Sequence, residues 1–235
     1  MATSWADIVS AAMVQIDDVR LQEQLTVAPA QFYRRMAALI QQAMPLMCRP
    51  QELLHYLQDN VTEPEYADAE WTSTQESLNQ ETTVETGASG YELCSVVKVV
   101  NETGMISYTP YPAAQYNAET GSVTFPVQDE TGVAYMIDFY KDGSFADLTP
   151  TQIRLFALAV AVIWDERFSR NWLNMQQKLK DDSFTTGNEA NYIAQITKRM
   201  HDNRIAFNDE LRSYEQSCAY ANTMQYGTVQ NTKLI

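Results

Sequence analysis

A run of twelve mostly apolar residues, Ile153 to Trp164, constrains the fold more than any other feature of this sequence. Thr149 and Pro150 precede the run, and a threonine cap followed by proline is typical of a helix start. We therefore predict a helix from Pro150 to about Asp181. Its first half is apolar on nearly all sides, so other elements must enclose it. The run is too short to cross a bilayer, which takes about 20 residues, and no membrane contact is expected.

Helical periodicity recurs in the first 59 residues and again near the C-terminal end. Ser4 can cap a first helix, Pro29 can start a second, and a short third helix can begin at Pro50. Their predicted buried positions recur every three or four residues: Trp5, Ile8, Val9, Ala12, Met13, Ile16, Phe32, Met36, Leu39, Ile40, Ala43, Leu53, Leu54 and Leu57. A last helix is expected over 188–222, and it should lie antiparallel against the helix that starts at Pro150.

The net charge of −14 is concentrated in one part of the chain. Residues 50–140 hold 15 acidic side chains and one basic side chain, whereas the segments on either side are balanced. A surface this acidic repels phosphate groups. Sequence-specific binding of nucleic acid and binding to anionic membranes are therefore not expected.

Residues 60–90 contain seven acidic and no basic side chains, and they show neither strand nor helix periodicity over any length. This composition predicts a long, solvated acidic loop. The acids that would form an acidic surface, or line the lumen of a ring, are Glu63, Glu65, Asp68 and Glu70. Tyr66 and Trp71 in the same segment fit two interpretations: an anchor for a partner's pocket, or collapse of the loop onto its own domain.

From Tyr91 to Phe145 the pattern is that of short strands separated by glycine-containing turns. The predicted class is α+β, consisting mainly of long antiparallel helices (a helical bundle) with an inserted small antiparallel β domain. The expected parts are an N-terminal helical region at 1–59, an acidic loop at 60–90, a β insertion at 91–147, a long helical hairpin at 148–223 and a C-terminal docking tail at 224–235.

Side chains that carry catalysis or bind metals are sparse. The two histidines, His55 and His201, have no second His or Cys at ligand spacing, and the three cysteines form no CxxC pair. Asp165 and Glu166 precede Arg170, but helical spacing makes Glu166 and Arg170 a surface ion pair rather than an acid–base pair. No catalytic residue, metal or cofactor is predicted.

The two ends of the chain carry distinctive patterns of apolar and turn residues. Near the start these are SWADIVSAAMVQIDD and FYRRMAALIQQAMPLM, and around residue 150 the pattern is LTPTQIRLFALAVAVIWDERFSRN. A DDSF turn at 181–184 then leads to a helix that ends in YEQSCAY. These motifs resemble the neck proteins of tailed bacteriophages, in particular the head-to-tail adaptors, or connectors. They leave residues 60–147 unmatched.

The resemblance implies a virion structural protein, not an enzyme, that forms a ring, usually twelve-fold, on the portal protein. Its partners would be further copies of the chain, the portal and the next neck or tail component, with DNA passing nearby without sequence-specific binding. Such a protein is made in the host cytoplasm and ends in the virion neck. The family grips the portal with C-terminal tails, which assigns that role here to Gln225, Tyr226, Val229, Leu234 and Ile235.

Other functions fit the same sequence. A stopper or tail-completion protein is a close variant within the phage neck. An acidic assembly or secretion chaperone would present a groove between helices and use its charge to screen a basic client protein. An enzyme would need Asp or Glu residues from separate helices to converge on a divalent metal, which is not predicted.

Overall fold

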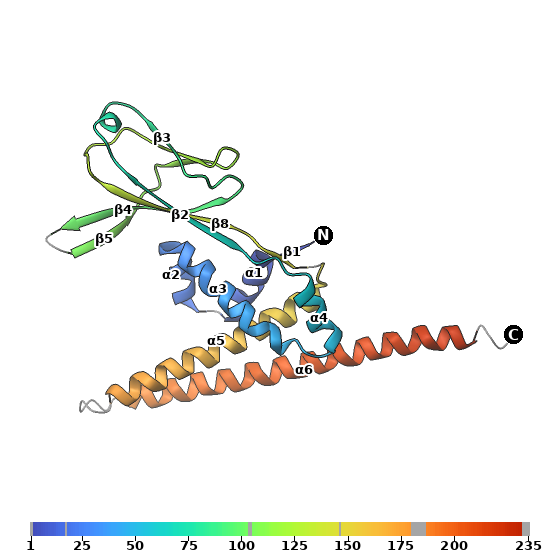
Figure 1. Cartoon of the computed structure of the whole chain (residues 1–235). Helices are drawn as coiled ribbons and strands as arrows, with labels where there is room; N and C mark the ends of the chain where they lie inside the picture. Colours follow the sequence, from blue (N-terminus) through green and yellow to red (C-terminus); the bar gives the residue numbers. More distant parts are fainter. Residues whose placement is uncertain (1, 17, 103–104, 146, 180–186, 232–235) are drawn as a thin grey trace. The chain divides into compact units, whose positions relative to one another are not determined.

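The computed structural model describes residues 2–16, 18–102, 105–145, 147–179 and 187–231 (Figure 1). These residues form six α-helices, two short 3-10 helices and nine strands. They divide into two compact units, each assembled from separate segments of the chain. The first unit comprises Met1–Asp18, Met36–Val61 and Ser144–Ile235, and the second comprises Val19–Arg35 and Thr62–Gly143.

The first unit is helical and is built around helix α5. Its elements are β1 (Thr3–Ser4), α1 (Trp5–Ile16), the second part of α3 (Pro29–Ala43), η1 (Met44–Leu46), α4 (Gln51–Asp59), β9 (Ser144–Phe145), α5 (Pro150–Leu179) and α6 (Gly187–Asn231). Strands β1 and β9 pair antiparallel, and α1, η1 and α6 pack against α5. Every side chain from Leu155 to Val162 is buried, which confirms that other elements enclose this helix.

Capping residues set the starts of two helices in this unit. The Ser4 hydroxyl accepts a hydrogen bond from the Asp7 N–H (3.0 Å), and the Asp7 carboxylate accepts one from the Ser4 N–H (3.1 Å). Thr149 and Gln152 form the same reciprocal pair at the start of α5. Each pair satisfies N–H groups that have no partner inside the helix. Both predicted helix starts are therefore confirmed.

Helices α5 and α6 lie side by side and run in opposite directions (Figure 1). Contacts between their polar side chains set the register: Gln152 with Tyr214, Arg154 with Glu210, Asp165 with Arg199 and Asn203, and Glu166 with Arg204. The ion pair predicted for Glu166 was with Arg170, whose side chain is not among the described ones. The observed partner, Arg204, comes from the facing helix instead.

The second unit combines two antiparallel sheets with helix α2 (Val19–Val27) and the first seven residues of α3. One sheet has the strand order β2-β8-β4-β5, and the other has the order β3-β7-β6. The strands are β2 (Glu65–Thr72), β3 (Thr82–Glu85), β4 (Glu92–Glu102), β5 (Met105–Pro110), β6 (Gln115–Asn117), β7 (Ser122–Phe125) and β8 (Ala134–Lys141), with η2 (Glu76–Leu78) between β2 and β3. Side chains from both sheets share one apolar core: Ala88, Val96, Val123, Phe125, Tyr135, Ile137 and Phe139.

The prediction of a chain made mainly of long antiparallel helices is wrong. The described residues have a mixed α+β structure in which four of the six α-helices are only 9 to 15 residues long. The strands form three antiparallel sheets. Only α5 and α6, with 30 and 45 residues, have the expected length. Several strands have only three or four residues, and β2 is rich in acids and alanine, so the strand pattern in this sequence is weaker than the helical one.

Two predicted segment boundaries are also wrong. Residues 60–90 are not one solvated loop, because Glu65–Thr72 is a full strand of the four-stranded sheet and Thr82–Glu85 is a strand of the other sheet. The N-terminal region 1–59 is not one unit either, since Val19–Arg35 belongs with the strands. Helix α3 is continuous across this boundary, so nothing in its periodicity marks the division.

Candidate functional site

The C-terminal part of α6 extends past the start of α5. Gln152, in the first turn of α5, donates a hydrogen bond to the hydroxyl of Tyr214 (2.8 Å). Because the two helices are antiparallel, the residues of α6 after Tyr214 run beyond the N-terminal end of α5. Helix α6 continues to Asn231, so at ~1.5 Å per residue the extension is roughly 25 Å long. Figure 1 shows this end of α6 passing α4 on its way to the C-terminus.

A cavity of about 800 Å³ lies between α4 and this part of α6. Its lining includes the apolar and aromatic side chains of Leu53, Tyr56, Tyr214 and Cys218, and three acids, Glu52, Asp147 and Glu215. None of the residues that line it is basic. The cavity therefore suits a segment that combines apolar side chains with a positive charge.

The residues predicted to dock on the portal lie at the end of α6 or beyond it. Gln225, Tyr226 and Val229 belong to the helix, which ends at Asn231. Leu234 and Ile235 lie outside the described residues. The prediction of a separate tail that starts at residue 224 is therefore wrong, because the helix continues through Gly227.

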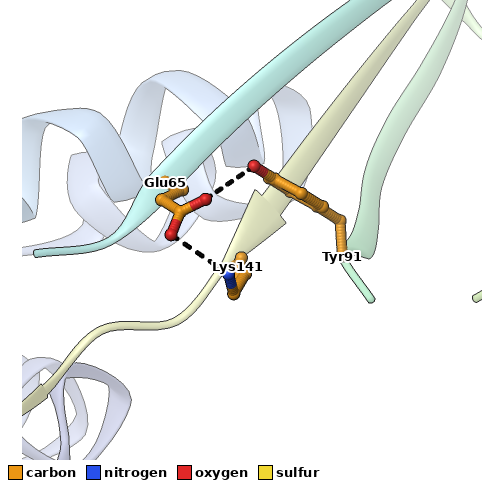
Figure 2. Close-up of polar contacts among 3 residues, drawn as sticks. All are labelled: Glu65, Tyr91 and Lys141. Carbon is orange, nitrogen blue, oxygen red and sulfur yellow. Dashed lines mark hydrogen bonds and ion pairs between the residues drawn. The ribbon is translucent and has the colours of Figure 1, made fainter. Parts of the chain in front are cut away.

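Strand β2 carries the acidic residues that the sequence singled out. They are Glu63, Glu65, Asp68 and Glu70, with Glu63 just before the strand. Figure 2 shows that the carboxylate of Glu65 contacts both Tyr91 and Lys141. The Tyr91 hydroxyl donates a hydrogen bond to Glu65 Oε2 (2.8 Å), and Lys141 Nζ lies 3.0 Å from Oε1. These contacts, that of Tyr91 first, lower the pKa of Glu65. Glu65 and Lys141 are exposed and Tyr91 is half-buried against the apolar core, so the cluster joins strand ends at the surface, where an ion pair adds little stability.

The outer face of β2 holds two further acids. Asp68 and Glu70 are exposed and alternate with Ala67, Ala69 and Trp71, which pack against the apolar core. Asp68 lies directly opposite Asp138 of β8. The second unit as a whole contains 15 acidic and five basic residues. It therefore carries most of the negative charge of the chain.

The two aromatic residues of the predicted loop anchor contact their own unit. Trp71 stacks on Phe125 with ring centroids 4.1 Å apart and on Tyr135 at 5.3 Å. Tyr66 lies under the Arg34 guanidinium, 5.2 Å from the ring centroid, and burial raises its pKa to about 12. Both side chains therefore pack onto their own domain, which is the second of the two interpretations given by the sequence. The interpretation as a loop anchor is corrected accordingly.

Sequence reasoning missed a basic cavity in the first unit. This cavity, of about 310 Å³, is lined by Pro45, Leu46, Cys48, Arg49, Phe207, Asn208, Leu211 and Arg212. Arg49 precedes α4 and Arg212 lies on α6, so only the fold brings the two cations to one place. No local pattern of either segment could have predicted this pairing.

Neither a metal site nor a membrane-spanning helix is found in the described part of the chain. No group of three or more His, Cys, Asp or Glu side chains is arranged there to hold a metal ion. None of the helices described has a stretch that is both long and apolar enough to span a membrane. Comparison of the chain with protein-family models, with curated proteins and with solved structures finds no match.

Proposed function

We propose that this chain is a structural, non-enzymatic protein of the phage neck: a ring-forming head-to-tail adaptor that docks on the portal and forms part of the passage for DNA. The observation that supports this most is the extension of α6 past the start of α5. A helix of that length gains most of its stability from packing against other elements. The extension therefore favours a protein that completes its packing against a second chain.

The distribution of charge fits a ring through which DNA moves. The second unit has a net charge of −10 from 15 acidic and five basic residues. Several copies around a passage would add up to a strongly negative wall, and such a wall repels the phosphate backbone. DNA would then pass without sticking, and without any reading of its sequence. In this proposal the protein resides in the neck of the virion.

Deletion of residues 225–235 tests the docking role in the intact phage. We expect particles that fill with DNA but fail to retain it or to attach tails, because the end of α6 and the residues after it no longer grip the portal. The measurement is electron microscopy of particles together with infectious yield. Circular dichroism of the truncated protein checks that it folds, and full-length protein supplied in trans should restore the yield. Normal infectious yield from the deletion alone would remove the docking role.

A second candidate function is supported by the acid-lined cavity between α4 and α6. Leu53 and Tyr56 with Glu52 and Glu215 would suit a basic, partly apolar client segment, as in an acidic assembly or secretion chaperone. The two functions differ in stoichiometry and in destination. A chaperone would form a small complex with one basic client and would be absent from finished particles, whereas an adaptor would remain in them in many copies.

A further inference from the structure

Arg49 and Arg212 both lie at the basic cavity, and neither has a carboxylate partner among the described residues. Arg154, Arg199 and Arg204 each contact a carboxylate of the facing helix. Arg49 and Arg212, in contrast, are exposed and line the basic cavity of the first unit. In a chain with 30 acidic and 16 basic residues, two unpaired guanidinium groups at one cavity mark a place where carboxylates from elsewhere can bind.

The basic cavity has the chemistry of a carboxylate receptor. Phe207 and Leu211, which are 4% and 5% exposed, contribute apolar side chains to its lining. A guanidinium group binds a carboxylate through two parallel hydrogen bonds, and apolar surroundings strengthen such a contact relative to one in open water. Two arginines therefore suit two neighbouring carboxylates on one rigid element.

The outer face of β2 offers such a pair. Asp68 and Glu70 are two residues apart on a strand, so their side chains point to the same side roughly 7 Å apart. Both are exposed, and neither makes an ion pair with a described residue. Asp68 also lies directly opposite Asp138. Like charges in directly opposite positions destabilise a sheet, and an arginine from another chain would relieve this repulsion.

We propose that Arg49 and Arg212 of one copy bind Asp68 and Glu70 of a neighbouring copy, and that this contact joins the copies of the ring. The inference rests on the proposed function only in requiring that copies assemble. Local charge favours this pairing over one between two second units, because the second unit carries a net charge of −10, whereas the lining of the basic cavity contains two arginines and no acidic residue. Two such units repel each other, whereas the basic cavity attracts one of them.

Charge reversal on each side of the contact tests the proposal with the full-length chain. Mass photometry and sedimentation would measure the assembly of wild type, of R49E/R212E and of D68K/E70K. Each variant alone should assemble at least about tenfold more weakly than wild type, and an equal mixture of the two should recover most of the assembly. The matched control is R167E/K198E, which reverses two exposed charges outside the cavity and should assemble like wild type.

Three results would overturn the proposal. The first is wild-type assembly by both variants, and the second is a wild-type chain that stays monomeric. The third is rescue only when all four substitutions are in one chain, which would place the contact within a chain. Circular dichroism and the thermal midpoint verify that each variant is folded. These assembly assays test only the contact between copies. The proposed function is tested separately, by binding to purified portal and by presence in particles.

Discussion

At the scale of single residues, Asp165 is the most informative side chain of the helical pair. It is 2% exposed and directly follows the apolar run of α5, and its carboxylate accepts hydrogen bonds from Arg199 (2.6 Å) and Asn203 (2.7 Å) of α6. A buried carboxylate is costly unless it is paired and hydrogen-bonded. These bonds are therefore satisfied only in one register of α5 against α6, which makes Asp165 a determinant of that register.

Replacement of Asp165 by alanine should lower the free energy of unfolding by about 2 kcal/mol, since Arg199 and Asn203 lose their partner at a buried site. The matched control is E166A in the next position. Glu166 also contacts an arginine, Arg204, at 2.6 Å, but the Glu166 side chain is 23% exposed against 3% for Asp165, so its loss should cost less than about 1 kcal/mol. Denaturant unfolding followed by circular dichroism gives both values. Equal losses for the two variants would contradict the assigned role of Asp165.

The contrast between Asp165 and Glu166 also marks a limit of sequence reasoning. Both are acids on one helix with arginines nearby in the chain; Glu166 was predicted to form a surface ion pair with Arg170, and Asp165 was given no role of its own. Which one is buried depends on the position of α6, and that position is set by contacts between residues more than 30 positions apart. Helix starts were predictable because Ser4 with Asp7, and Thr149 with Gln152, are local pairs.

At the scale of elements, strand β2 was missed although it spans eight residues. In EYADAEWT the residues that face the shared core include two alanines, Ala67 and Ala69, while the alternate positions hold the half-buried Tyr66 and two exposed acids. Polar and apolar residues do alternate along β2. However, alanine is only weakly apolar, so this alternation is hard to distinguish from the acidic sequence around it. Acids on an edge strand also discourage unwanted pairing of strands, which explains how a sheet strand can have the composition of a loop.

The corrected position of Trp71 is tested by W71A. Because Trp71 stacks on Phe125 and Tyr135, its removal should destabilise the second unit by about 2–3 kcal/mol. Hydrogen exchange of the β7 and β8 amides measures this loss directly. Y108A is the matched control, since Tyr108 is 61% exposed and its loss should change stability by less than about 0.5 kcal/mol. Unchanged exchange in W71A would restore the interpretation of Trp71 as an anchor for a partner.

At the scale of the whole molecule, the chain passes between its two units several times. Residues 19–35 and 62–143 form one unit, and three separate segments form the other. Composition indicated that the acidic middle part of the chain is distinct from its ends. It did not indicate that α2 belongs to the second unit, because α2 is amphipathic like the helices of the first unit. The basic cavity arises only from this arrangement, because Arg49 and Arg212 come from separate segments of the first unit. The acids of β2 were predicted from the sequence as an acidic surface, but their place on one face of a strand was not.

Assembly of copies of this chain in the neck of a virion underlies both the docking role and the contact between copies proposed above. The measurement that tests it most directly is the location of the protein in purified, intact particles by imaging and quantitative proteomics. We expect many copies per particle, as a ring between the portal and the tail. Absence from finished particles, or a single copy bound elsewhere, would contradict the account.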